Sequence, residues 1–240
     1  MSQSLPRFDP APGYARVKIV HSFDELAKTR FADGVNALCW QRQLEGDFAE
    51  VVRHLTLDDD IVALDDATLR ALPLSAAGQQ AVDTLIEDQR RLRELGLVPV
   101  LECIRKYSRD VDDAAVPTDV YSFHADSATV ETDTYLCSYT EASSEGLRQD
   151  EARRCTDIPE TRAALLATFG GKDDNEFAAY LSENCYDLHY VERPTSQPFS
   201  FGLGHLWRIA VDYPGCPVPP CVHRAPDTVP GRPPRLLLIS

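Results

Sequence analysis

The chain has 240 residues, of which 43% are hydrophobic and 26% charged, so it is long and apolar enough to bury one sizeable core. A charged fraction of this size is ordinary for a globular protein and argues against global disorder. The net charge of −14 repels phosphate backbones and anionic lipids, so we expect no nucleic acid and no membrane among the partners. A cationic or zwitterionic small substrate would suit such a surface.

No stretch of the sequence approaches the roughly 20 apolar residues that a membrane span needs. The N-terminal sequence, MSQSLPRFDPAPGY, lacks the basic patch and apolar run of a secretory signal. The seven cysteines are irregularly spaced, which fits reduced thiols better than a disulfide framework. We therefore expect a cytoplasmic protein.

The first hundred residues are predicted to be mainly helical. Residues 1–15 are rich in Pro, Ser and Gly and are expected to form a flexible tail, followed by a mainly helical flank over 16–97. The clearest helix is predicted over 75–95, where an apolar stripe at helical spacing ends at a glycine: Val82, Leu85, Ile86, Leu92 and Gly96. Further helices are expected over about 23–30 and 45–55, with short strands over 17–20 and 35–40.

Residues 98–240 have a different character. Short β-like runs alternate with polar turns, which indicates a sandwich or barrel. Helical insertions are expected at about 159–169 and 175–184. Strands are predicted over 98–107, 120–125, 134–139, 188–191, 199–211, 221–224 and 235–240. The sequence therefore predicts an α+β protein whose β core occupies 98–240, with the helical flank packed on it as one compact unit.

A histidine and an aspartate stand two residues apart in one of these runs, at His124 and Asp126. Positions i and i+2 of a strand point to the same face, so the two side chains are expected to project together. An imidazole beside a carboxylate supplies two of the three ligands of a facial triad. Such a triad holds Fe(II) and leaves coordination positions open for a cosubstrate and dioxygen.

The third ligand is expected to be a later histidine. His223 is preferred, 99 residues on (223 minus 124), with His205 and His189 as competitors. The reason is Arg235, 12 residues further (235 minus 223), which opens the last predicted strand. A fixed guanidinium there can bind a carboxylate bidentately.

This order of residues resembles the Fe(II)/2-oxoglutarate-dependent oxygenase superfamily, which folds as a double-stranded β-helix, or jelly roll. The resemblance covers roughly 98–240. It implies that His124, Asp126 and His223 bind iron and that Arg235 binds the distal carboxylate of 2-oxoglutarate, with Arg232 or Arg224 as alternatives. Retention of the aspartate implies hydroxylation, desaturation or cyclisation of a small molecule rather than halogenation.

The chain also looks like an uncharacterised bacterial domain family in which a cysteine–x–tyrosine strand runs into a turn ending in glutamate. Here Cys137-Ser138-Tyr139 leads to Glu145, without that family's glycine–proline–glycine core. In the oxygenases the corresponding strand lies near the cosubstrate, so Tyr135 and Tyr139 are candidates to contact 2-oxoglutarate.

Two other interpretations stay open from the sequence. One is a cupin-like metalloprotein on the same barrel that does not use 2-oxoglutarate. The other is a non-enzymatic metal-binding module, including a zinc site built from Cys216 and Cys221 with His223 and His205.

Overall fold

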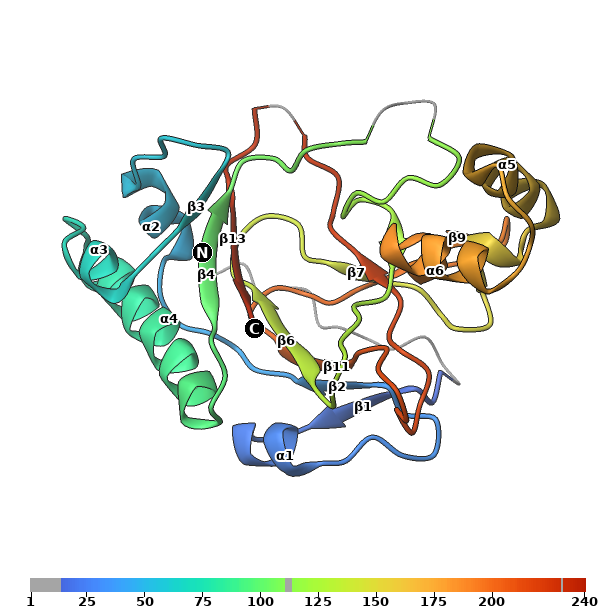
Figure 1. The fold of residues 1–240 in the computed structure, drawn as a ribbon. Helices are drawn as coiled ribbons and strands as arrows, with labels where there is room; N and C mark the ends of the chain where they lie inside the picture. Colours follow the sequence, from blue (N-terminus) through green and yellow to red (C-terminus); the bar gives the residue numbers. More distant parts are fainter. Residues whose placement is uncertain (1–13, 111–113, 230) are drawn as a thin grey trace.

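The computed structural model describes residues 14–110, 114–229 and 231–240; most of the expected N-terminal tail lies outside these residues. Two sheets form the protein (Figure 1). The first has seven strands in the order β1 (Val17–Val20), β2 (Ala37–Trp40), β11 (Leu206–Ala210), β6 (Asp133–Ser138), β13 (Arg235–Ile239), β4 (Val100–Ile104) and β3 (Ile61–Ala63). It is a mixed sheet, because β1 and β2 are parallel and the other pairs are antiparallel.

The second sheet has six antiparallel strands, and most of them are short. Their order is β10 (Phe199–Ser200), β7 (Glu145–Gly146), β12 (His223–Arg224), β5 (Phe123–His124), β9 (His189–Glu192) and β8 (Ala152–Arg154). The sheet forms half of a barrel whose other half is the longer sheet.

Helices lie on both sides of this core. Figure 1 shows α2, α3 and α4 beside β3 and β4, and α5 and α6 at the other end of the molecule beside β9. Side chains of Ser22, Asp47, Asp65, Ser75 and Asp174 cap the first turns of α1, α2, α3, α4 and α6. The helices are α1 (Phe23–Lys28), α2 (Phe48–His54), α3 (Asp66–Arg70), α4 (Ala76–Glu94), α5 (Pro159–Phe169) and α6 (Asn175–Glu183), with 3₁₀ turns η1 (Cys155–Asp157) and η2 (Tyr186–Leu188).

The seven-stranded sheet packs differently on its two faces. On β13, Leu236 and Leu238 join the cluster formed with α2 and α4, whereas Leu237 joins the cluster between the two sheets. Because alternate residues of a strand point to opposite faces, Arg235 shares the inner face with Leu237. The space between the sheets is therefore reached by every second residue of β13.

From β4 onward the chain passes repeatedly between the two sheets. β4, β6, β11 and β13 belong to the longer sheet, and β5, β7, β10 and β12 belong to the shorter one. Consecutive segments such as β5 and β6 consequently lie in opposite sheets, and polar residues on their inner faces can meet across the core.

The α+β class is confirmed, and helices occur along the chain as well as within residues 16–97. This segment also supplies β1, β2 and β3, which extend the longer sheet at both edges. β3 and the five-residue α3 were not predicted, because elements this short contain too few residues to establish a period. Helices α5 and α6 form where the sequence expected them, between β8 and β9. Among the residues described, no helix has the length and apolarity to cross a membrane.

Candidate metal centre

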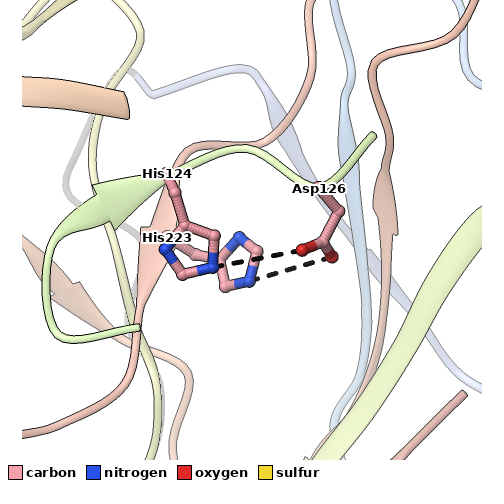
Figure 2. A group of neighbouring side chains, drawn as sticks. All are labelled: His124, Asp126 and His223. Carbon is pink, nitrogen blue, oxygen red and sulfur yellow. Dashed lines mark ion pairs between the residues drawn. The ribbon is translucent and has the colours of Figure 1, made fainter. Parts of the chain in front are cut away.

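His124, Asp126 and His223 come together in the space between the sheets. His124 ends β5 and His223 begins β12, and these two residues are directly opposite each other in the antiparallel pair. Asp126 lies just beyond the end of β5, where its backbone carbonyl accepts a hydrogen bond from Asp212. Figure 2 shows the two imidazoles and the carboxylate turned toward one another.

The three side chains form the one group of His, Cys, Asp or Glu residues, among those described, that could hold a metal ion. One ligand atom from each lies within 4.8 Å of the others. His124 Nε2 is 4.0 Å from Asp126 Oδ1, and His223 Nε2 is 3.9 Å from Asp126 Oδ2. These separations leave room for an ion between the ligand atoms instead of direct hydrogen bonds among them.

Each imidazole is oriented by its own backbone. His124 Nδ1 lies 2.8 Å from the carbonyl oxygen of Ser122, and His223 Nδ1 lies 3.2 Å from that of Cys221. A carbonyl oxygen only accepts hydrogen bonds, so Nδ1 carries the proton in both rings. The lone pair of Nε2 then points toward the group, which is the tautomer that metal coordination requires.

The carboxylate is oriented from the opposite sheet. Thr134 on β6 donates a hydrogen bond of 2.6 Å to Asp126 Oδ2. Burial raises the pKa of Asp126, but nearby His223 and the Thr134 hydroxyl outweigh it, so the net pKa is lowered. Burial, with a contribution from His223, lowers the pKa of His124 to about 4. The group therefore favours a neutral His124 beside an ionised carboxylate, the charge states that bind a metal.

The metal group is more deeply buried on the side of His223 than on the side of Asp126. His223 is 7% exposed, and its ring lies 6.4 Å from that of Phe201 in a stacked arrangement. The side chain of Asp126, by contrast, is 30% exposed. Solvent thus reaches the group at its carboxylate side.

The two competing histidines are not members of this group. His205 accepts a hydrogen bond from the backbone N–H of Arg42, and its Nε2 is buried without a hydrogen-bond partner. His189 lies on β9 directly opposite His124, with the two ring centroids 5.8 Å apart. The structure therefore brings His223, and neither His205 nor His189, into one group with His124 and Asp126.

Arg235 differs from the two alternative arginines in its partners. Arg224 is paired with Glu145 at 2.7 Å, and the exposed Arg232 lies 3.8 Å from Glu141. Arg235 is 7% exposed and donates to the hydroxyls of Ser138 and Ser144 at 2.9 and 2.7 Å. Its Nε is buried with no hydrogen-bond partner.

The guanidinium of Arg235 forms hydrogen bonds only with hydroxyl groups, although the carboxylate of Glu102 on β4 is near enough to interact with its charge. Tyr107 is the remaining hydrogen-bond partner recorded for Arg235, at 3.5 Å. Burial lowers the pKa of Arg235, although an arginine stays charged near neutral pH. The residue also lines a hollow of about 80 Å³ with Tyr107, Glu141 and Arg232. The lining of this hollow does not include the three metal-site residues.

The prediction that Tyr135 and Tyr139 contact a cosubstrate is wrong on the position of their side chains. Both belong to the cluster on the helix side of the longer sheet. The Tyr139 hydroxyl donates to Asp88 of α4 at 2.7 Å. Tyr135 and Tyr139 share one face of β6, and this is the face that packs against the helices. The inner face carries Thr134 and Ser138, which sequence analysis missed and which the same alternation could have identified.

The alternative zinc site is not assembled among the described residues. Cys216 donates its thiol hydrogen to the carbonyl of Val218, and the fully buried Cys221 belongs to the apolar cluster between the sheets. Burial raises the pKa of Cys221 to about 12, which disfavours a thiolate ligand in the absence of a metal.

Comparison with known protein families, with curated proteins and with solved structures finds no match to this chain. The function is therefore inferred from the geometry and chemistry of the described residues.

Proposed function

We propose that the protein is a non-haem Fe(II)/2-oxoglutarate-dependent oxygenase acting on a small molecule. The observation that carries the proposal is the convergence of two imidazole Nε2 atoms and one carboxylate from His124, His223 and Asp126. Two nitrogens and one oxygen on the same side of an ion are the ligand set of the Fe(II) oxygenases. The preset Nδ1–H tautomers and the Thr134 hydrogen bond support a metal site over a chance cluster.

The path of the chain supports the same proposal. Alternation of β4, β6, β11 and β13 with β5, β7, β10 and β12 is the winding expected of a double-stranded β-helix. In this arrangement the ligands come from neighbouring strands of the shorter sheet. The arginine begins the last strand of the longer sheet, as in the family that the sequence resembles.

Arg235 supports 2-oxoglutarate as the cosubstrate. Its guanidinium is positioned by Ser138 and Ser144, and its Nε lacks a partner. Burying a cation that is hydrogen-bonded to no carboxylate is costly, and a carboxylate of a bound ligand would match the planar donor edge of arginine. We therefore assign the distal carboxylate of 2-oxoglutarate to Arg235.

The spacing of residues along β6 is compatible with one short ligand that reaches from the metal group to Arg235. Thr134, which holds Asp126, and Ser138, which holds Arg235, share the inner face and are four residues apart (138 minus 134). Four residues of a strand cover about 13 Å. A metal–ligand bond, a five-carbon dicarboxylate and the reach of an arginine side chain together can bridge such a distance.

The residues of the chain would then have separate tasks. Bound Fe(II) and 2-oxoglutarate would supply the oxidative decarboxylation that activates dioxygen against a substrate C–H bond. His124 and His223 would hold the ion, and Asp126 would neutralise part of its charge. Phe201 and its neighbours exclude water on the His223 side, which limits side reactions.

The test is an anaerobic titration of the metal-free protein with Fe(II), followed by 2-oxoglutarate. We expect one ion per chain and then the weak visible charge-transfer band of the chelated cosubstrate. His124→Ala should abolish both signals, whereas His54→Ala, an exposed histidine at the end of α2, should change neither. If no ion binds to the wild-type protein, the proposal fails.

One observation favours a second candidate, a metalloprotein of the same fold that does not use 2-oxoglutarate. The hydroxyls of Ser138 and Ser144 already accept hydrogen bonds from the Arg235 guanidinium, so the arginine could serve to stabilise the fold instead of binding a ligand. In the same titration this candidate predicts iron binding without the charge-transfer band. Oxygen consumption that does not depend on added 2-oxoglutarate would then identify an oxygenase of that kind.

A further inference from the structure

His189 lies in one row with the two histidines of the metal group, His124 and His223. In the shorter sheet His223 is directly opposite His124, and His124 is directly opposite His189. Residues directly opposite each other in antiparallel strands project from the same face. The ring centroids of neighbours in this row are 4.6 and 5.8 Å apart. Three imidazoles therefore stand side by side on the inner face, and the third has no part in the metal group.

His189 is oriented by the same device as the other two rings. Its Nδ1 lies 2.8 Å from the carbonyl oxygen of Cys185. Cys185 has a left-handed backbone (φ 58°) and precedes η2, so the turn before β9 brings that carbonyl to the imidazole. Since the carbonyl can only accept, Nδ1 carries the proton and Nε2 of the neutral ring is left as a hydrogen-bond acceptor. His189 is 6% exposed, so this acceptor is held in a largely buried position.

The opposite end of the row is apolar. Gly146 of β7 faces His223, and Phe199 of β10 faces Gly146. A Cβ atom on Gly146 would lie 2.3 Å from the Phe199 ring, so the absence of a side chain lets the aromatic ring cover this position. The metal group is thus flanked by an aromatic wall on the β10 side and by a polar imidazole on the β9 side.

We propose that His189 is a ligand-binding residue of the metal centre. Its Nε2 accepts a hydrogen bond from an O–H or N–H group of the molecule bound at an open coordination position. The substrate class this predicts is a small molecule with a hydroxyl or amine group near the oxidised carbon and an apolar part toward Phe199. This proposal rests on the proposed function only in requiring a metal ion at the His124–Asp126–His223 group.

The test uses Zn(II) as the metal and two small chelators that differ in one donor. Acetohydroxamate carries an N–H group, which its N-methyl derivative lacks. By calorimetry on the Zn(II)-loaded protein, we expect wild type to prefer acetohydroxamate about five- to tenfold, the worth of one hydrogen bond. His189→Gln, which keeps an acceptor, should retain part of this preference. His189→Phe should bind Zn(II) within about threefold of wild type and lose the preference, and His54→Phe should behave as wild type.

A second measurement needs no variant. In ¹⁵N-histidine NMR of the Zn(II)-loaded wild-type protein, the Nδ1 atom of His189 should carry a proton, and its Nε2 resonance should shift when acetohydroxamate binds. Equal chelator preference in wild type and His189→Phe, or a proton on His189 Nε2, would overturn the assignment of His189 alone. Failure of wild type to bind Zn(II) would instead overturn the metal centre, and the role of His189 with it.

Discussion

The hydroxyl of Thr134 donates a hydrogen bond of 2.6 Å to Oδ2 of Asp126, so that a residue of the longer sheet fixes a carboxylate that follows a strand of the shorter sheet. The metal group is therefore completed only when the two sheets are packed together. Residues that orient a metal ligand without touching the metal typically contribute about 10- to 100-fold to metal affinity.

Thr134→Val is expected to weaken Fe(II) or Zn(II) binding about 10- to 100-fold, because the carboxylate loses its fixed orientation while the shape of the side chain is preserved. Metal affinity by calorimetry measures this effect. Thr168→Val on α5, which removes a hydroxyl that bonds only to its own helix, is the control and should leave affinity unchanged. An unchanged affinity in Thr134→Val would mean that Asp126 is positioned by its backbone alone.

The buried Arg235 and the partly buried Arg208 are expected to have opposite effects on stability. Arg208 is paired with Asp133 at 2.6 Å and also donates to backbone carbonyls of residues 26, 27 and 29. Arg208→Met should lower the free energy of unfolding by about 3 kcal/mol, because it leaves these groups without their partner. Arg235→Met removes a cation whose hydrogen bonds go only to hydroxyl groups and whose carboxylate neighbour, Glu102, interacts with it through charge. The substitution should leave the free energy of unfolding unchanged or raise it by about 1 kcal/mol.

Urea denaturation of both variants checks this pair, and the charge-transfer titration checks function. Arg235→Met should keep iron binding and lose the 2-oxoglutarate band. A large loss of stability in Arg235→Met would assign the residue to the structure of the core and favour the candidate that does not use 2-oxoglutarate.

Tyr139 belongs to a network on the helix side of the longer sheet. Its hydroxyl and the Arg42 guanidinium both donate to the buried carboxylate of Asp88. Tyr139→Phe should therefore cost about 1 kcal/mol of stability and leave 2-oxoglutarate binding unaffected. Asp88→Ala should cost about 3–5 kcal/mol, because Arg42 then stays buried without a carboxylate. Loss of the 2-oxoglutarate band in Tyr139→Phe would contradict the position assigned to this side chain.

The pKa of His124 predicts how the metal-free protein responds to acid. Burial and His223 lower this pKa from 6.5 to about 4, so between these values the unfolded chain binds a proton that the folded protein does not. Stability should consequently fall as the pH falls from 6.5 to 4, by up to about 1.4 kcal/mol per pH unit for this one group, with no further loss from it below pH 4.

Urea denaturation of the metal-free protein at pH 7 and pH 5 measures this effect. His124→Gln cannot titrate and should show a smaller difference between the two pH values. An equal pH dependence in wild type and His124→Gln would show that His124 is not the group responsible.

The sequence by itself determined the local features of this protein. Helix α4 was predicted over 75–95 and spans Ala76–Glu94, with Ser75 as its N-cap, because a helical apolar period and a capping side chain are properties of neighbouring residues. The shared orientation of His124 and Asp126 could be predicted for the same reason, because residues two positions apart in a strand point to the same face.

Only the tertiary structure decided which distant residues meet. The pairing of β5 with β12, and of β5 with β9, brings together histidines that are far apart in the chain, and no local pattern encodes strand neighbours. The sequence also could not predict which face of β6 points toward the shorter sheet. Alternation divides the residues of a strand between two faces but does not say which face is inward. In the folded protein the inner face of β6 carries Thr134, which contacts the metal group, and Ser138, which contacts Arg235. The opposite face carries Tyr135 and Tyr139, which pack among the apolar residues of α2 and α4.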